Sequence, residues 1–213
     1  MKILKTLFLL LCLPIMLNAK EYYVATNGND ANSGSIDSPF ATLARAQSEA
    51  APGDIVYIRG GKYTIKESQI MGEKENIYAC VFLMDKIGTD NEHRICYFGY
   101  PGERPVFDLS HVKPAGKRIS VFYVSGSYLH FKNIEVVGTQ VTIVGHTQSE
   151  CFSNRGGNNN IYEDLSMHDG MGIGFYLVKG AGNLILNCDA YNNYDTVSDG
   201  GKGGNVDGFG GHP

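Results

Sequence analysis

A short glycine-rich stretch near the end of the chain holds four carboxylates and a single lysine: Asp189, Asp195, Asp199, Asp207 and Lys202. Clustered carboxylates raise one another's pKa, and they stay ionised at low cost only when a cation lies among them. Carboxylate oxygens are hard ligands, which favour Ca²⁺ over zinc or iron. This pattern predicts a calcium site.

The four aspartates differ in where they lie relative to the predicted strands. Asp189 ends one strand and Asp207 opens the next, so stacked strands would bring them together, and we predict both as metal ligands. Asp195, in the insertion between them, is the third predicted ligand. Asp199 is interpreted as a solvated turn residue, because turns use Asp, Asn and Gly for their own conformational reasons.

The elements that must position these carboxylates are short strands. Residues 20–65 predict a small α/β cap, with strands at 22–25 and 55–58 and a helix over 41–51. After residue 65 the helical signals stop, and β-branched or aromatic runs alternate with Gly, Asn, Pro and Asp. The further strands are predicted at 81–84, 94–98, 105–108, 119–124, 128–131, 134–137, 141–144, 161–167, 174–178 and 183–190.

An internal repeat identifies the fold class. Asp164 and Asn187 occupy matching positions 23 residues apart, and Asn133 precedes Asp164 by 31. Gly174 and Gly208 match at a separation of 34, which leaves room for an insertion. A period near 23 with three short strands per turn predicts an all-β parallel β-helix over 66–213, with Asn ladders at its turns. An antiparallel sandwich is the alternative.

The first nineteen residues predict a cleavable leader. A basic start, an apolar run over 6–17 and a small residue at Ala19 have the layout of a secretory signal peptide. The apolar run is shorter than the roughly 20 residues that a bilayer requires, so no membrane span is predicted. We therefore expect a secreted or periplasmic protein.

Charge and cysteine content limit the kinds of partner and metal that the protein is expected to bind. Residues 20–213 carry 16 basic and 22 acidic side chains, a net charge of −6, which disfavours a nucleic-acid partner. The spacing of the four cysteines outside the leader matches no zinc pattern: Cys80, Cys96, Cys151 and Cys188. Buried free thiols are favoured over a disulfide framework, whose pairing the sequence leaves open. We expect a monomer.

The chain also resembles a known family. The runs at 22–30, 38–42 and 52–63 look like the amino-terminal cap of many secreted right-handed β-helix carbohydrate enzymes. Residues 187–195 followed by 204–209 resemble the calcium-site region of polysaccharide lyase family 9, the pectate and rhamnogalacturonan lyases. The resemblance covers most of 21–213 in order, and it implies a right-handed parallel β-helix.

The resemblance implies β-elimination on an acidic pectic polysaccharide. Ca²⁺ held by aspartates would bridge to the uronate carboxylate, and a neutral Lys would remove the C5 proton. By position, Asp189 and Asp207 match the family's calcium aspartates, with Asp195 less close, whereas Gly203 and Gly204 stand where the family has further aspartates. The family's catalytic Lys lies beyond that segment, so the base is expected beyond Pro213 in a longer chain.

Other side chains and other functions are weighed against this interpretation. Lys179 and Lys202 are interpreted as solvated charges, and His168 and Asp169 as strand neighbours that point to opposite faces. The alternatives are a carbohydrate-binding or adhesin β-helix without catalysis, and a β-helix glycoside hydrolase, which would need two carboxylates about 5 to 10 Å apart. The sequence does not distinguish polygalacturonate from rhamnogalacturonan.

Overall fold

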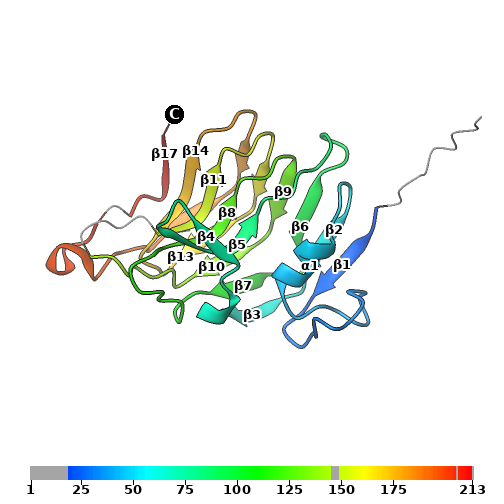
Figure 1. Ribbon diagram of the computed structural model, residues 1–213, viewed down its shortest axis with the longest axis horizontal. Coiled ribbons are helices and arrows are strands. Elements are labelled where there is room, and N and C mark those ends of the chain that lie inside the picture. The colour runs from blue at the N-terminus through cyan, green and yellow to red at the C-terminus, as the bar shows by residue number, and fades with distance from the viewer. Residues whose placement is uncertain (1–18, 145–148, 205, 213) are drawn as a thin grey trace, which may run out of the picture.

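The computed structural model describes residues 19–144, 149–204 and 206–212, which wind into a three-sided parallel β-helix (Figure 1). Sheet 1 has the spatial order β1 (Glu21–Val24), β2 (Ile55–Ile58), β6 (Ile95–Gly99), β9 (Leu129–Lys132), β12 (Ile161–Glu163) and β15 (Leu184–Leu186). Sheet 2 has the order β3 (Gly61–Thr64), β7 (Pro105–Asp108), β10 (Glu135–Val137), β13 (Ser166–His168) and β16 (Asp189–Tyr191). Sheet 3 has the order β4 (Gly72–Lys74), β5 (Tyr78–Met84), β8 (Arg118–Val124), β11 (Glu150–Arg155), β14 (Ile173–Val178) and β17 (Phe209–His212).

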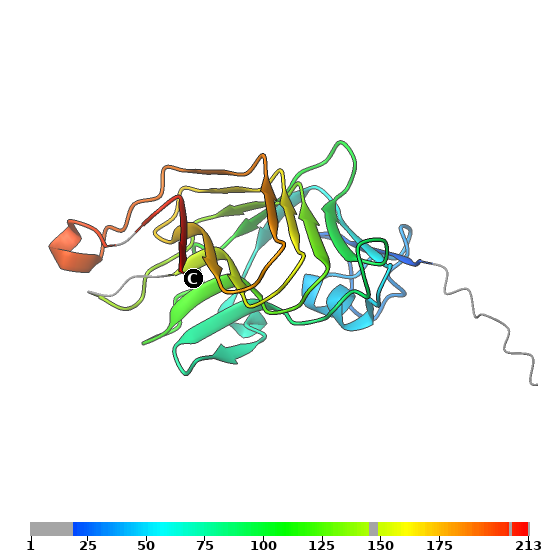
Figure 2. The ribbon, with the colours of Figure 1, turned by 90° about the horizontal axis from the view of Figure 1, so that it is seen from above.

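The register of the strands confirms the repeat. Ile161 pairs with Leu184, 23 residues further along the chain, and Phe175 pairs with Phe209, 34 residues further. The neighbouring strands within the three sheets are parallel, apart from β4, which pairs antiparallel with β5. Figure 2 shows the coils stacked along the long axis of the molecule, with the segment around η2 (Ser198–Gly201) projecting from one end. The predicted β-helix is therefore correct, and the sandwich alternative is wrong.

The matching Asn and Asp positions turn the chain from sheet 1 into sheet 2. Asn133, Asp164 and Asn187 have φ values of 55°, 52° and 51°. This left-handed conformation is costly for most residues but accessible to Asn and Asp, whose short side chains bond locally. Each strand predicted through such a residue is therefore two strands: 161–167 covers β12 and most of β13, and 183–190 covers β15 and most of β16.

The interior is a stack of large apolar side chains, one from each strand of a coil. Phe122 and Phe152, on neighbouring strands of sheet 3, stack with ring centroids 4.2 Å apart and planes 3° from parallel. Phe131 and Tyr162 stack in the same way on sheet 1, at 5.4 Å and 10°. Phe122, Phe131, Phe152 and Tyr162 are fully buried. Parallel in-register pairing places like residues above one another, so the repeat builds a continuous core.

The short helix α1 (Leu43–Glu49) packs against β1, β2 and β5 at one end of the coils (Figure 1). Thr42 caps it by accepting a hydrogen bond from the amide of Arg45, and Leu43 and Ala46 bury its inner face. The helix is shorter than the predicted 41–51, because Ala50 is already extended with ψ of 136°. A 3₁₀ turn, η1 (Glu67–Gln69), follows β3.

The remaining sequence predictions have different outcomes. No strand forms over 141–144, and β4 and β11 were not predicted, since β11 mixes apolar residues with Glu150, Ser153, Asn154 and Arg155. The four cysteines outside the leader are free, as favoured above. The predicted leader, 1–19, lies outside the described residues apart from Ala19. Within the described residues, no helix is long and apolar enough to cross a membrane.

Candidate functional site

Asp189 begins β16 on the outer face of sheet 2, in register with Ser166 of β13. Its side chain is exposed, and it lines a polar groove of about 400 Å³ with Arg104, Asn133, Asp164, Ser166 and Asn187. Arg104 donates hydrogen bonds to Glu135 and Ser166 in this groove. Asp189 therefore lines a groove that already contains the positively charged side chain of Arg104.

Asp195 is fully buried within the segment that joins β16 to β17. Its Oδ1 accepts hydrogen bonds from the amides of Val197 (2.8 Å) and Ser198 (3.0 Å). Burial acts to raise the pKa of Asp195, but the hydrogen bonds from Ser198 and Val197 outweigh it and lower the pKa below its usual value. Its Oδ2 is buried and makes no hydrogen bond of good geometry with the described residues, although the Ser198 side chain and the amide of Gly204 also help to lower the pKa of this carboxylate.

Asp207 lies two residues before β17, with an exposed side chain. Its carbonyl accepts a hydrogen bond from Gly174 (3.1 Å), which holds it at the entrance to sheet 3. A Cβ added at the following residue, Gly208, would lie 3.5 Å from the Cβ of Ala190. The segments that carry Asp189 and Asp207 are therefore adjacent, as the stacked coils predicted.

The three predicted ligands supply hard oxygen atoms, which suits Ca²⁺. They are not gathered into one cluster, because within the described ranges no three or more His, Cys, Asp or Glu residues are placed to hold a metal ion. Their donor chemistry therefore fits the cation, whereas a complete ligand set does not follow from the described side chains. The calcium site stays a prediction.

The structure places the remaining candidates as follows. Lys202 is exposed at the end of η2, and Lys179 is exposed at the end of β14 with a φ of 62°. The prediction that His168 and Asp169 diverge is wrong, because Asp169 adopts a left-handed φ of 51° and its Oδ2 lies 2.7 Å from His168 Nδ1. His168 also stacks on Tyr191 with a centroid distance of 4.4 Å.

Sequence reasoning missed a charged cluster on the outer face of sheet 3. Glu150 is fully buried and lies 2.5 Å from the guanidinium of Arg155, which also donates to the hydroxyl of Tyr78 (2.7 Å). Burial raises the pKa of Glu150 to about 7, although Arg155 and hydrogen bonds from Ser153 and Tyr78 oppose the shift. Residues five apart on a regular strand point to opposite faces, so strand alternation provided no signal that Glu150 and Arg155 would meet.

This buried acid predicts a pH effect on stability. Because the pKa of Glu150 is raised from 4.5 to about 7 on folding, the folded state binds more protons between these values and loses stability as the pH rises through them. Glu150→Gln cannot ionise, so its free energy of unfolding relative to the wild type should rise by about 2 kcal/mol between pH 5 and pH 8. Urea unfolding at both pH values measures this, with the exposed Glu92→Gln as control. Parallel pH profiles for Glu150→Gln and the wild type would contradict the prediction.

Comparison with known proteins identifies the family of this chain. Residues 22–213 match the family described as Pel9A-like, right handed beta helix region. Pectate lyase L of Dickeya dadantii is 31% identical over 191 residues, which are 89% of this chain and 40% of that protein. The chain thus spans less than half the length of this curated relative.

Two solved structures share the fold. A rhamnogalacturonan lyase superposes with a TM-score of 0.88 at 56% identity, covering 91% of this chain and 46% of that one. The pectate lyase Pel9A superposes with a TM-score of 0.65 at 28% identity, covering 84% of this chain and 42% of that one. The stacked coils, their 23-residue register and these matches agree, and the chain therefore belongs to the Pel9A-like right-handed β-helix family, the polysaccharide lyase family 9 that its sequence resembles.

Proposed function

We propose that the protein acts, within a complete chain, as a secreted, Ca²⁺-dependent lyase that cleaves an acidic pectic polysaccharide by β-elimination. The observation that carries the proposal is the 56% identity, at a TM-score of 0.88, to a solved rhamnogalacturonan lyase. Because this identity is twice the 28% shared with Pel9A, the rhamnogalacturonan backbone is favoured over polygalacturonate as the substrate. A monomer is the proposed form.

Three carboxylates of this chain would hold the cation: Asp189, Asp195 and Asp207. The buried Oδ2 of Asp195 makes no hydrogen bond of good geometry with the described residues, which supports this assignment, since a buried ionised oxygen is stabilised by a cation. A bound Ca²⁺ would supply positive charge that attracts the uronate carboxylate and stabilises the anionic transition state. The hydrogen bonds from Val197 and Ser198 keep Asp195 ionised and oriented for that role.

Product chemistry tests the proposal. The protein, in its complete chain, is incubated with rhamnogalacturonan and with polygalacturonate, and ultraviolet absorbance detects the 4,5-unsaturated uronide. We expect absorbance to grow with Ca²⁺ present and to stop when a chelator is added. New reducing ends without absorbance would overturn the proposal in favour of a hydrolase, and polysaccharide binding without any product would favour an adhesin.

Calcium binding tests the ligands separately. Isothermal titration of Ca²⁺ into the protein should detect binding that is lost in Asp189→Ala, Asp195→Asn and Asp207→Ala, because each removes a charged ligand from the same ion. Asp199→Asn, at the exposed tip of η2, is the matched control, because it removes the charge while asparagine tolerates the left-handed φ of 49°, and it should bind as the wild type does. Binding that survives the substitution of Asp207 would remove this residue from the site.

A further inference from the structure

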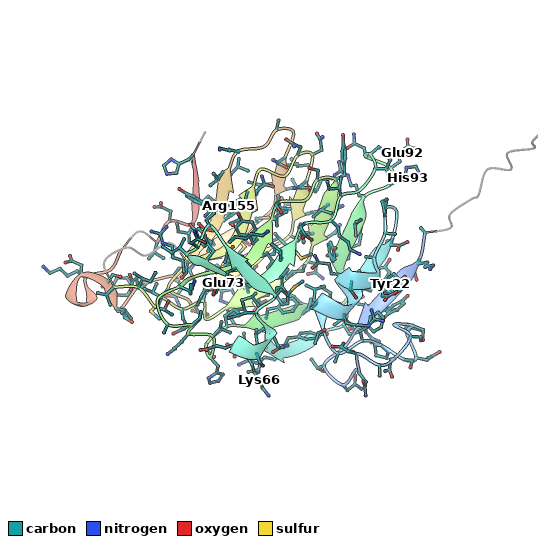
Figure 3. All side chains as sticks on the ribbon, in the orientation of Figure 1. Tyr22, Lys66, Glu73, Glu92, His93 and Arg155 are labelled. Atoms are coloured by element: carbon teal, nitrogen blue, oxygen red, sulfur yellow. The ribbon has the colours of Figure 1, made fainter. Side chains whose placement is uncertain are left out.

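A small cavity opens on the outer face of sheet 3, beside the cluster around Glu150. It has a volume of about 300 Å³ and is lined by Glu75, Tyr123, Arg155, Val178 and Lys179. These residues come from the turn between β4 and β5, from β8 and β11, and from the end of β14. Figure 3 labels Arg155 among the side chains of sheet 3. A volume near 300 Å³ is at the lower end of ligand pockets and suits a single sugar ring.

The guanidinium of Arg155 is fixed in place beside this cavity. The side chain is only 9% exposed, and one edge is bonded to the buried Glu150 and to the hydroxyl of Tyr78. Its guanidinium carbon lies 4.5 Å from the ring centroid of Tyr78 and 5.6 Å from that of Tyr176. A planar guanidinium held between aromatic rings is preorganised to bind a carboxylate with little further loss of entropy.

The other edge of the guanidinium faces an acidic side chain at the cavity. Arg155 Nη1 lies 3.7 Å from Glu75 Oε1, which is beyond hydrogen-bond distance. Glu75 belongs to an exposed turn with a φ of 54°, and its carboxylate is also held by the hydroxyl of Tyr123 at 3.0 Å. Because its side chain is half exposed, this charge pair contributes little to stability. Another carboxylate could therefore replace Glu75 at low cost.

Lys179 provides a second positive charge at the cavity. Its side chain is exposed, and within the described residues no ion pair with it is found. Its backbone carbonyl accepts a hydrogen bond from Asn154 (3.0 Å), which anchors this residue at the end of β14. The cavity thus combines two cations with the ring of Tyr123, the combination of charges and flat surface that a sugar acid would contact.

We propose that this cavity is a subsite for one acidic sugar residue, whose carboxylate binds between Arg155 and Lys179 in place of Glu75 while its ring packs against Tyr123. The proposal rests on the proposed function, since it assigns the class of sugar that the polysaccharide supplies. It adds a calcium-independent contact with the substrate, and it makes Glu75 a competitor of that substrate.

The subsite lies close to Asp207. Tyr176 contacts Arg155 on one side and pairs in register with Gly210 of β17 on the other. A Cβ added at Gly210 would lie 3.0 Å from the ring of Tyr176 and 3.7 Å from Asp207 Oδ2. Arg155 and Asp207 are therefore on either side of the Tyr176 ring, and the strands β11 and β17 are separated by two strand spacings, roughly 10 Å. One short oligosaccharide running across sheet 3 can reach both.

Binding of trigalacturonate in the presence of EDTA tests the subsite without calcium. The protein is titrated by calorimetry with this acidic trisaccharide and with the neutral galactotriose. We expect the acidic sugar alone to bind, Lys179→Gln to weaken binding by about three- to fivefold, and Glu75→Gln to strengthen it by a similar factor. Glutamine at 75 keeps an acceptor for Tyr123, and glutamine at 179 removes the charge while keeping a polar side chain that is one bond shorter. Lys113→Gln, an exposed lysine elsewhere, should leave the affinity unchanged.

Several results would overturn the subsite. They are no trigalacturonate binding in EDTA, equal binding of galactotriose, or equal affinities in Lys179→Gln and Glu75→Gln. These outcomes are separate from those of the lyase test, which depends on added Ca²⁺ and on product absorbance. Arg155 is left unsubstituted because its removal would leave the buried Glu150 without its charge partner. Thermal unfolding of each variant checks that the fold is intact.

Discussion

Phe152→Ala should lower the free energy of unfolding by about 3 to 5 kcal/mol. The ring of Phe152 is fully buried and stacks face to face on Phe122 at 4.2 Å, while its other contacts are edge-on to Phe131 at 5.9 Å and to Tyr162 at 6.2 Å. Alanine would remove these contacts and leave a cavity between neighbouring coils. Because each coil of a solenoid is stabilised mainly by its neighbours, the loss would weaken both adjacent interfaces. Equilibrium denaturation measures the change.

Phe152→Leu is the matched control for the size of the cavity. Leucine keeps an apolar side chain at the position but not the parallel stack on Phe122, so the loss should be about 1.5 kcal/mol. A loss below 1 kcal/mol for Phe152→Ala would show that the stacked rings contribute little and that the coils collapse around the gap.

Asn160→Ala should lower the free energy of unfolding by about 3 kcal/mol, because it removes the partner of two buried backbone groups and of one buried side-chain oxygen. Asn160 is fully buried between sheets 3 and 1, and its Oδ1 accepts a hydrogen bond from the amide of Leu129 (2.8 Å). Its Nδ2 donates to the carbonyl of Gly126 (2.9 Å) and to Asn154 Oδ1 (3.0 Å). Urea unfolding measures the loss, and hydrogen exchange at the Leu129 amide should speed up at the same time.

Asn158→Ala is the control for Asn160→Ala. Asn158 Oδ1 accepts a hydrogen bond from the amide of Ala181 at 2.8 Å, but the side chain is exposed, so water replaces the lost bond. We expect a loss below about 1 kcal/mol for this variant. Equal losses of unfolding free energy for Asn158→Ala and Asn160→Ala would mean that burial does not determine how much these asparagine hydrogen bonds stabilise the fold.

The candidate site was predictable only in part. The sequence placed Asp189 and Asp207 on adjacent segments, and the contact between Ala190 and Gly208 confirms that adjacency. It did not predict that Asp189 would face a groove with Arg104, or that Asp195 would be buried with its Oδ1 bonded to Val197 and Ser198. Which way each carboxylate points depends on the conformation of the segment that joins β16 to β17, and composition alone does not specify that path.

Sequence analysis did not predict the cluster around Arg155, for a different reason. Strand prediction relied on apolar runs, whereas β11 places Glu150, Ser153 and Arg155 on the outer face of sheet 3. Their contacts come from other coils: Tyr78 precedes Arg155 by 77 residues, and Tyr123 belongs to β8. Only the closed coils bring these side chains within reach of one another.

The sequence by itself determined the period, the class of fold and the family, because these depend on local features that repeat. Large apolar residues recur at a 23-residue spacing, and Asn or Asp stands where a left-handed turn must form, as at Asp164 and Asn187. The tertiary structure alone decided which charges are buried, which carboxylates remain apart and which cations line a cavity. Those properties arise from contacts between coils, where a side chain's neighbours lie tens of residues away in the chain and its burial depends on what covers it.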